Sequence, residues 1–241
     1  MEEEMRIQKY LSECGVMSRR SAEEAIKRGR VIINGERAVI GQKIIPEIDE
    51  VLCDNILVTN ANNKKIYIMM YKPAGIVTTM SDEKGRECVA NLLKEADIGA
   101  RVYPIGRLDM YSEGLLLLTN DGELSNKLMH PKHEIIKVYH LTLKGELDLE
   151  KINALALPIE IDGRMSKPAN VSVIERKNGK TKLRVELSEG RNRQIRRICE
   201  NLELIILKLK RVCVGKINIG TLRPGQWKHL NFNEVKYLKE L

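Results

Sequence analysis

Four consecutive leucines, Leu115–Leu118, place the strongest restriction on how this chain can fold. A short apolar run between a glycine and the turn signal Asn120-Asp121-Gly122 is typical of a strand that is buried on both faces. The residues after this turn predict a helix that ends near Met129. We therefore expect an α+β protein whose larger domain has a mixed, mostly antiparallel sheet with helices packed on it.

Residues 5–48 begin with the pattern of two short helices. The first has apolar residues at helical spacing and ends at Gly15, where a left-handed conformation is easily adopted. Ser18 or Ser21 can cap the second helix, and Ser21 with Glu24 matches the spacing of a capping box. Gly29 marks the end of this second helix.

A hairpin follows the two helices. The dipeptide Asn34-Gly35 accepts positive φ at both central positions of a tight turn. Apolar residues flank it on both sides, at Val31–Ile33 and Ala38–Ile40, and these two runs predict the paired strands. The order of elements in this part of the chain is therefore helix, helix, hairpin.

A polar segment, Asn60–Lys65, separates this small domain from the rest of the chain. It is rich in Asn and Lys and has no apolar periodicity, which is typical of a linker. The length of 241 residues is compatible with two domains. We expect a first domain over residues 1–60, a linker over 61–65 and a second domain over 66–241.

The charge of the chain is basic and concentrated in one segment. The sequence has 41 Lys and Arg against 33 Asp and Glu, a net charge of +8. Residues 176–216 alone carry 13 basic and 4 acidic side chains, so the rest of the chain is close to neutral. Such a basic segment favours a polyanion as partner, and a solvated charged face without a ligand is the alternative. Aromatic residues make up only 4%, which argues against a binder that stacks single-stranded bases on rows of rings.

Several classes of protein are disfavoured by what the sequence lacks. No apolar run approaches the roughly 20 residues of a membrane-spanning helix, and the acidic N-terminus does not resemble a signal peptide, so we expect a cytoplasmic protein with no membrane partner. The five cysteines form no CxxC pair and are expected to be reduced, and the histidines are too irregularly spaced for a metal site. They are Cys14, Cys53, Cys88, Cys199 and Cys213, and His130, His133 and His140.

One carboxylate stands out as a candidate for chemistry. Asp109 lies in a polar, glycine-bounded loop between the apolar run Val102–Ile105 and the four leucines. Burial and the adjacent Arg107 could fix the rotamer of Asp109 and keep it ionised. On physical grounds alone, an Asp in such a loop is more often a turn residue.

The N-terminal segment resembles an S4-type RNA-binding domain. The resemblance is carried by RIQKYLSECGVMSRRSAEEAIKRGRVIINGERA, with its Leu-x-x-x-Gly helix, its Ser-Arg-Arg and its Asn-Gly hairpin. Basic residues crowd the second helix, and phosphate contacts are their expected use. The expected RNA-binding residues here are Arg19, Arg20, Lys27 and Arg28.

The second domain is similar to the RsuA family of ribosomal-RNA pseudouridine synthases. The segment GRLD, followed by Ser-Glu-Gly, four leucines and Thr-Asn-Asp-Gly, resembles the nucleophile motif of that family. The supporting segments are YKPAGIVTT, His130-Pro131, KVYHLTL and EGRNRQIRRICENL. The resemblance extends from Met5 to about Leu230. One departure is the bulky pair Met110-Tyr111 after GRLD, which makes a different substrate-side wall of the pocket conceivable.

The resemblance implies a reaction and residues that perform it. A uridine of ribosomal RNA is detached from its ribose, turned and rejoined through carbon 5, with no cofactor and no metal. Asp109 is implied as the nucleophile and Arg196 as the cation that lowers its pKa. Tyr139 is implied as the ring that stacks on the base, with proton transfer as a further role. Tyr139 can also be interpreted as an inward-facing ring on a strand, and this interpretation is compatible with the stacking role. The further RNA-binding residues implied are Arg107, Arg191, Arg193 and Arg197, and a charged outer helix face is the alternative for the last two.

We expect ribosomal RNA or a pre-ribosomal particle as the partner of a monomeric enzyme. A large-subunit target is favoured over a small-subunit target by the overall resemblance. A non-catalytic RNA-binding factor of ribosome assembly is the first alternative, although such a binder does not need Asp109, Tyr139 and Arg196 together. A nucleosidase or hydrolase is the second, although a small substrate does not need the basic N-terminal domain.

Overall fold

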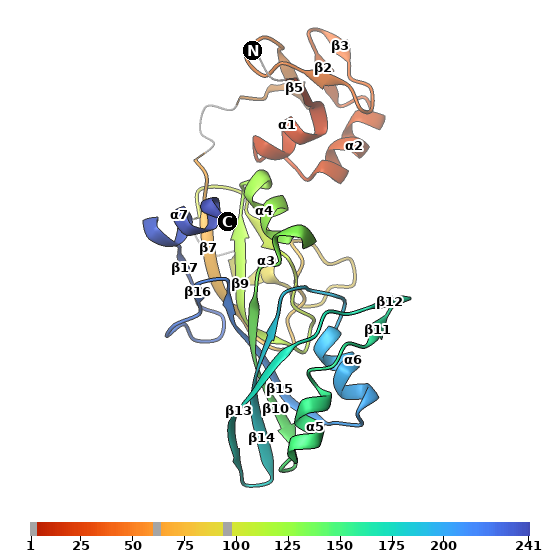
Figure 1. Cartoon of the computed structure of the whole chain (residues 1–241). Helices are drawn as coiled ribbons and strands as arrows, with labels where there is room; N and C mark the ends of the chain where they lie inside the picture. The colour runs from red at the N-terminus through yellow and green to blue at the C-terminus, as the bar shows by residue number, and fades with distance from the viewer. Residues whose placement is uncertain (1–3, 60–63, 94–97) are drawn as a thin grey trace. The chain divides into compact units, whose positions relative to one another are not determined.

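The computed structural model describes residues 4–59, 64–93 and 98–241 (Figure 1). The chain divides into two compact units. Unit 1 consists of Met1–Ile66 with two short additions, Ile98–Val102 and Asn120–Gly122, and unit 2 of the remaining residues. Of the expected linker, residues 61–63 lie outside the described residues, and the exact domain boundaries stay a prediction. The expected α+β class is confirmed.

Unit 1 contains the two predicted helices and short strands. The helices are α1 (Ile7–Glu13) and α2 (Arg19–Lys27), and the strands are β1 (Met5–Arg6), β2 (Val31–Ile33), β3 (Glu36–Arg37), β4 (Lys43–Ile44), β5 (Val51–Cys53) and β6 (Ile56–Leu57). Strands β3, β2, β5 and β6 form one sheet in this order, and β1 pairs with β4. Helix α1 packs its apolar side against α2 and β2, around the fully buried Ile7, Leu11 and Val31.

The start of α2 corrects one prediction. Ser18 is the N-cap, and its side chain accepts a hydrogen bond from the backbone of Ser21 at 3.0 Å. The predicted capping box of Ser21 with Glu24 is wrong, because the helix begins one turn earlier and Ser21 lies inside it. Gly15 and Gly29 have φ of +77° and +68°, as expected of residues that end helices.

The hairpin of unit 1 is present, but its second strand is displaced. Asn34 and Gly35 have φ of 51° and 85°, as the tight turn requires. Strand β3 follows this turn directly and pairs with β2. The strand predicted over Ala38–Ile40 is therefore wrong, and Val39 and Ile40 are exposed in a loop. The two-residue turn fixes the register, so the pairing residues are the ones next to it.

Unit 2 is built on a large sheet. Its helices are α3 (Val89–Leu93), α4 (Gly122–Met129), α5 (Leu149–Ala154), α6 (Gln194–Asn201) and α7 (Phe232–Glu240), with one 3₁₀ turn, η1 (Pro131–His133). Its strands are β7 (Tyr67–Lys72), β8 (Tyr103–Ile105), β9 (Glu113–Thr119), β10 (Lys137–Lys144), β11 (Glu160–Ile161), β12 (Arg164–Met165), β13 (Asn170–Lys177), β14 (Lys180–Leu187), β15 (Ile206–Val214), β16 (Ile217–Asn218) and β17 (Trp227–His229).

The sheet has the mixed and mostly antiparallel topology that the sequence predicts. Its strand order is β13-β14-β10-β15-β9-β7-β17, with β16 beside β15 and β8 beside β9. The described strand pairs are antiparallel except β15 with β9, which run parallel. Leu115–Leu118 lie in β9 and are at most 2% exposed, which confirms that this run is buried on both faces. The segment Ile76–Thr79 contributes an isolated bridge, between Val77 and Cys88.

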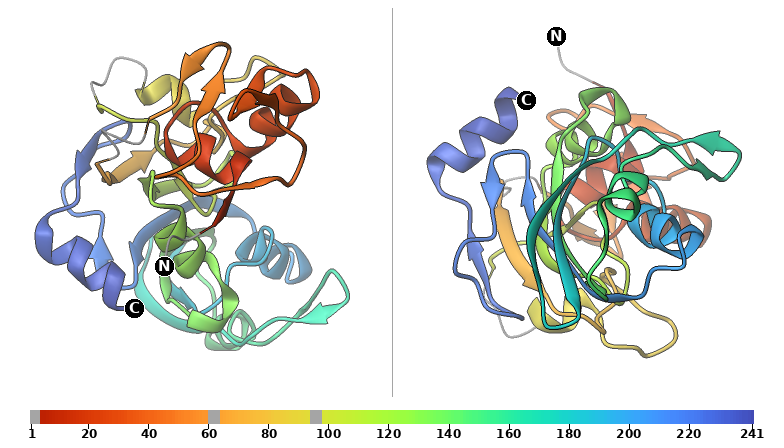
Figure 2. Two further views of the ribbon diagram at one scale, coloured as in Figure 1. Left: turned by 90° about the horizontal axis from the view of Figure 1, so that it is seen from above. Right: turned by 60° about the horizontal axis from the view of Figure 1, so that its bottom comes forward.

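The strands β14, β10 and β15 have two different faces. On one face, α5 and α6 pack against buried residues such as Leu141, Leu183 and Val185 (Figures 1 and 2). Along β14 every second residue is buried, and the residues between them are exposed or half-buried. This period of two assigns neighbouring residues of one strand to opposite faces.

One glycine is required where the parallel strands meet. Gly114, at φ +106°, lies against the backbone of Arg211 on β15, and a Cβ atom here would collide with the Arg211 carbonyl oxygen. The two strands can therefore approach only because this residue has no side chain. The contact brings Arg211 beside Leu115, whose carbonyl accepts from the Arg211 Nε at 2.8 Å.

Candidate active site

The loop that carries Asp109 is held by the segment after β7. Strands β8 and β9 pair antiparallel, so the loop over residues 106–112 joins their adjacent ends. The hydroxyl of Thr78 donates to the carbonyl of Leu108 at 2.7 Å, and the backbone N–H of Gly75 donates to the carbonyl of Met110 at 2.7 Å. The segment YKPAGIVTT thus supports the loop on both sides of Asp109.

A buried lysine completes this support. Lys72 at the end of β7 is 0% exposed. Its Nζ donates to the carbonyls of Pro73 and Ile76, at 2.8 and 2.6 Å, and lies 3.5 Å from the carbonyl of Met110. Burial lowers the pKa of Lys72 to about 8, partly opposed by the negative charge of Asp109. No pattern in the sequence singled out this residue.

The Asp109 carboxylate is fully hydrogen-bonded. Its Oδ1 accepts from the backbone N–H groups of Tyr111 and Ser112, both at 2.9 Å. Its Oδ2 accepts from the Ser112 hydroxyl at 2.6 Å and from the Arg196 Nε at 3.0 Å. Arg196 also donates from Nη2 to the Ser112 hydroxyl at 3.0 Å. The expected pairing of Arg196 with Asp109 is present, and Asp109 is at the same time the turn residue that the alternative reading proposed.

These contacts decide the charge of Asp109. Burial of the carboxyl group acts to raise its pKa, but the hydrogen bonds from Arg196 and Ser112 outweigh burial and lower the pKa below the ordinary value. The side chains of Asp109 and Arg196 are 21% and 12% exposed, so their charges are only weakly screened by solvent. At neutral pH the pocket therefore holds an ionised, partly accessible carboxylate.

A cavity of about 1270 Å³ opens over this carboxylate. Asp109, Tyr139 and Arg196 all line it, so the three residues expected to be catalytic lie in one pocket. Tyr139 comes from β10, is half-buried and also packs against the core, so both readings of this ring apply. Arg107 lines the pocket as an exposed side chain. The cation against Asp109 is Arg196 rather than Arg107.

A short hairpin forms one wall of the pocket. Strands β11 and β12 pair with each other, and Asp162-Gly163 forms the turn between them. The Nη atoms of Arg191 donate to the carbonyls of Ile161, Arg164 and Met165, at 3.3, 2.7 and 2.6 Å. Its Nε donates to Glu189 at 3.1 Å. Arg191, expected to bind RNA, therefore fastens the hairpin to the loop before α6.

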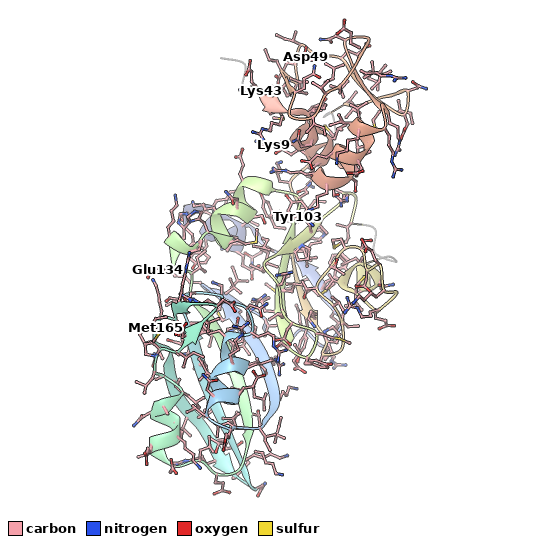
Figure 3. The ribbon with its side chains drawn as sticks, turned by 90° about the vertical axis from the view of Figure 1, so that its right-hand side faces the viewer. Lys9, Lys43, Asp49, Tyr103, Glu134 and Met165 are labelled. Atoms are coloured by element: carbon pink, nitrogen blue, oxygen red, sulfur yellow. The ribbon has the colours of Figure 1, made fainter. Side chains whose placement is uncertain are left out.

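Further contacts tie this wall to α6 and α4. Glu189 accepts from the backbone of Lys167 at 2.8 Å and from the side chain of Gln194 at 2.9 Å. The side chain of Lys167 forms an ion pair with Glu134, which follows α4 and is labelled in Figure 3. Because α6 also carries Arg196, the hairpin and the Asp109 partner belong to one hydrogen-bonded assembly.

The remaining expected RNA-binding residues have varied surroundings. Arg193 lines the pocket and pairs with Glu200 at 3.1 Å. Arg197 pairs with Asp162 of the hairpin turn at 2.8 Å. In unit 1, the candidates on and beside α2 are all exposed, and Lys27 pairs with Glu24 at 2.8 Å; these candidates are Arg19, Arg20, Lys27 and Arg28.

Ser112 is the contact that the sequence analysis missed. Asp side chains commonly accept from backbone N–H groups about two residues further on, so Asp109 itself signalled a turn that brings Ser112 close. Lys72 donates to the nearby carbonyls of Pro73 and Ile76 and lies close to that of Met110 in the Asp109 loop. Arg191 donates to three carbonyls of the distant β11–β12 hairpin. No pattern in the sequence indicated these contacts.

Neither a membrane span nor a metal site stands out in the described part of the chain. Over residues 4–59, 64–93 and 98–241, no helix combines the length and apolar character that crossing a bilayer requires. Within the same ranges, no group of three or more His, Cys, Asp or Glu side chains is arranged to hold a metal ion.

Comparison with known proteins gives consistent matches. Residues 66–201 match the family described as RNA pseudouridylate synthase, and residues 5–51 match the S4 domain. An uncharacterized RNA pseudouridine synthase of Aquifex aeolicus is 39% identical over 98% of this chain and 94% of that protein. Ribosomal large subunit pseudouridine synthase B of Bacillus subtilis is 38% identical over 98% of this chain and 96% of that protein. A crystal structure of a pseudouridylate synthase superposes with a TM-score of 0.69 at 28% identity, covering 97% of this chain and 99% of that one.

Proposed function

The chain belongs to the RNA pseudouridylate synthase family, and we propose that it converts a uridine of large-subunit ribosomal RNA into pseudouridine with Asp109 as nucleophile. The large-subunit target is supported by the name of the Bacillus subtilis relative, and ribosomal RNA as partner by the S4 domain. The monomeric state and the cytoplasmic location stay predictions.

The observation that carries this proposal is the ionised carboxylate of Asp109 in a pocket lined by Tyr139. A base inside a stacked RNA cannot reach a carboxylate at the bottom of a pocket, so the target nucleotide has to be turned out of its stack. A cavity of about 1270 Å³ is large enough for a nucleotide. We assign to Tyr139 the stacking of its ring on the extruded base.

In the proposed reaction the carboxylate of Asp109 attacks C1′ of the ribose, and the N1–C1′ bond breaks with its electron pair going to uracil. The detached uracil turns until its C5 faces C1′. The new C5–C1′ bond displaces the carboxylate, C5 loses its proton, and N1 takes up a proton. The product contains the atoms of the substrate, so the reaction needs neither a redox agent nor a group donor.

Arg196 and Ser112 have two tasks in this reaction. They keep Asp109 ionised before attack, and they stabilise the carboxylate again when it leaves. Oδ2 of Asp109 accepts both of these hydrogen bonds. Rotation of the Ser112 hydroxyl therefore frees a lone pair on Oδ2, while the hydrogen bond from Arg196 stays in place.

Asp109→Asn tests the proposal. The amide keeps the shape of the side chain and removes the nucleophile, so a large-subunit rRNA transcript tritiated at uracil C5 should release no tritium in a single-turnover assay. RNA affinity should stay within about twofold. Asp54→Asn removes one charge from an exposed ion pair of unit 1 and is the matched control. Release by Asp109→Asn within tenfold of the unmodified enzyme would exclude Asp109 as the nucleophile.

A further inference from the structure

The sheet face opposite to the pocket carries a concentration of basic side chains. The strand register places these residues on one face. On β10, His140 lies opposite Arg184 of β14 and Lys210 of β15, and Thr142 lies opposite Lys182 and Lys208. The intervening residues Tyr139 and Leu209 line the pocket on the other face. We call this surface of β14, β10 and β15 the basic sheet face; its basic residues are Lys144, Lys180, Lys182, Arg184, Lys208 and Lys210.

The side chains of this face converge. His140 lies at its centre, and its pKa is lowered by burial and by the positive charges of Lys182, Lys210 and Arg184. All six basic residues are exposed or half-buried. The positive charges are therefore close enough to act together and remain open to a ligand.

Carboxylates neutralise only part of this charge. Glu113 pairs with Lys208 at 2.9 Å, and Glu186 pairs with Arg184. Lys210 lies over the ring of Tyr71, 4.6 Å from its centroid. Among the described residues, the remaining three basic residues, Lys144, Lys180 and Lys182, form no ion pair with a carboxylate. Glu175 on β13 lies opposite Lys182 in register and pairs with Lys177 instead.

The position of these strands excludes one common explanation. Lysines on a sheet often protect an edge strand from pairing with another chain. Here β13 is an edge strand, and β15 pairs with β9 only at Lys210 and Arg211. The other basic residues of the face lie on β10 and β14, which have a partner strand on each side; they are Lys144, Lys180, Lys182 and Arg184. Like charges on neighbouring strands also destabilise a sheet, so their accumulation indicates a ligand of opposite charge.

We propose that the basic sheet face is a second RNA-binding surface, which holds the phosphate backbone of structured ribosomal RNA at a distance from the target uridine. The lysines of the face can neutralise phosphates, and phosphate contacts carry affinity without reading sequence. The identity of the RNA rests on the proposed function. The surface adds to the affinity of large substrates, because a short RNA that fills the pocket on the other side of the sheet does not reach it.

The test removes the three lysines of this face that, among the described residues, have neither a carboxylate partner nor a ring contact. Lys144→Gln, Lys180→Gln and Lys182→Gln are combined in the full-length protein. The matched control combines Lys84→Gln, Lys151→Gln and Lys236→Gln, which removes the same charge from exposed positions off this face. Binding to a complete large-subunit rRNA transcript is measured as a function of salt concentration. Binding and tritium release are also measured on a short RNA hairpin that contains the target uridine.

Each lost phosphate contact reduces the slope of log affinity against log salt by about 0.7 to 0.9. We expect the triple variant to lose about two slope units on the complete transcript, and the control to lose none. Binding and release on the short hairpin should stay within about twofold. Equal slopes for the triple variant and the control, or equal weakening on both RNAs, would overturn the proposal. Failure of every protein to release tritium would instead contradict the proposed function and leave the slope comparison valid.

Discussion

Replacing Lys72 by Met tests how the buried ammonium group contributes to this fold. Met fills nearly the same volume and removes the charge. Burial lowers the pKa of Lys72 from 10.5 to about 8, so the folded protein binds this proton less tightly than the unfolded chain does. A shift of this size corresponds to about 3 kcal/mol at roughly 1.4 kcal/mol per pKa unit. Because the folded-state pKa is the lower one, the destabilisation is fully present below pH 8 and disappears as the pH rises towards 10.5.

The measurement is urea unfolding of both proteins at several pH values between 7 and 10. The free energy of unfolding of the unmodified protein, relative to that of Lys72→Met, should rise by about 2 to 3 kcal/mol over this range. Taking the difference between the two proteins cancels the titration of other groups. An exposed lysine, Lys228, replaced by Met is the control and should give a flat difference. A flat difference for Lys72→Met as well would show that the charged form of Lys72 is not disfavoured in the folded state.

The same variant should also reduce turnover. Met cannot donate to the three carbonyls around the Lys72 ammonium group, and one of these carbonyls belongs to Met110 next to Asp109.

Two further predictions concern the proposed function. Arg196→Met should lower turnover by about 100-fold or more and shift the acid limb of the pH–rate profile to higher pH, because the pKa of Asp109 rises when its cation is removed. An unshifted acid limb in the pH–rate profile would contradict this role. Arg19→Gln combined with Arg20→Gln on α2 should reduce the salt slope of rRNA binding by about 1.5 units, as measured by titration of the complete transcript. A slope parallel to that of the unmodified protein would leave these two side chains as a solvated surface.

The central strand and the small domain were predictable because their signals are local. The four leucines of β9 predict burial on both faces, and their neighbours Gly114 and Asn120 mark the ends of the run. The turn Asn34-Gly35 also follows from its two residues alone. The errors arose where several local solutions compete. Ser18 and Ser21 both suit an N-cap, and the register imposed by the hairpin turn overrides the apolar character of Val39 and Ile40.

For the candidate site, the sequence indicated residues that share a pocket, but few of the contacts that these residues make. The resemblance indicated Asp109, Tyr139 and Arg196, and the structure places all three in one pocket. The resemblance could not indicate that the guanidinium group of Arg191 donates to three carbonyls of a hairpin about thirty residues earlier in the chain. Such contacts depend on how distant segments pack, and a motif identifies a basic residue without identifying its partner.

The strands β10, β14 and β15 have two faces, one towards the pocket and one that carries the basic sheet face. Residues of the two faces alternate along the sequence. Composition shows one basic segment over residues 176–216, which as a whole favours a polyanion. Successive side chains of a strand point to opposite faces of the sheet, so the basic residues of this segment divide between the two faces. Arg211 points towards the pocket, and Lys208 and Lys210 point away from it. The basic residues of α6 and of its N-cap form a third group. Arg196 pairs with Asp109, Arg197 with Asp162, and Arg193 with Glu200. Net charge per segment therefore overstates the charge available at the pocket. Lys180, Lys182 and Lys210 form no ion pair among the described residues and lie on the opposite face, where we expect their strongest effect on large RNAs.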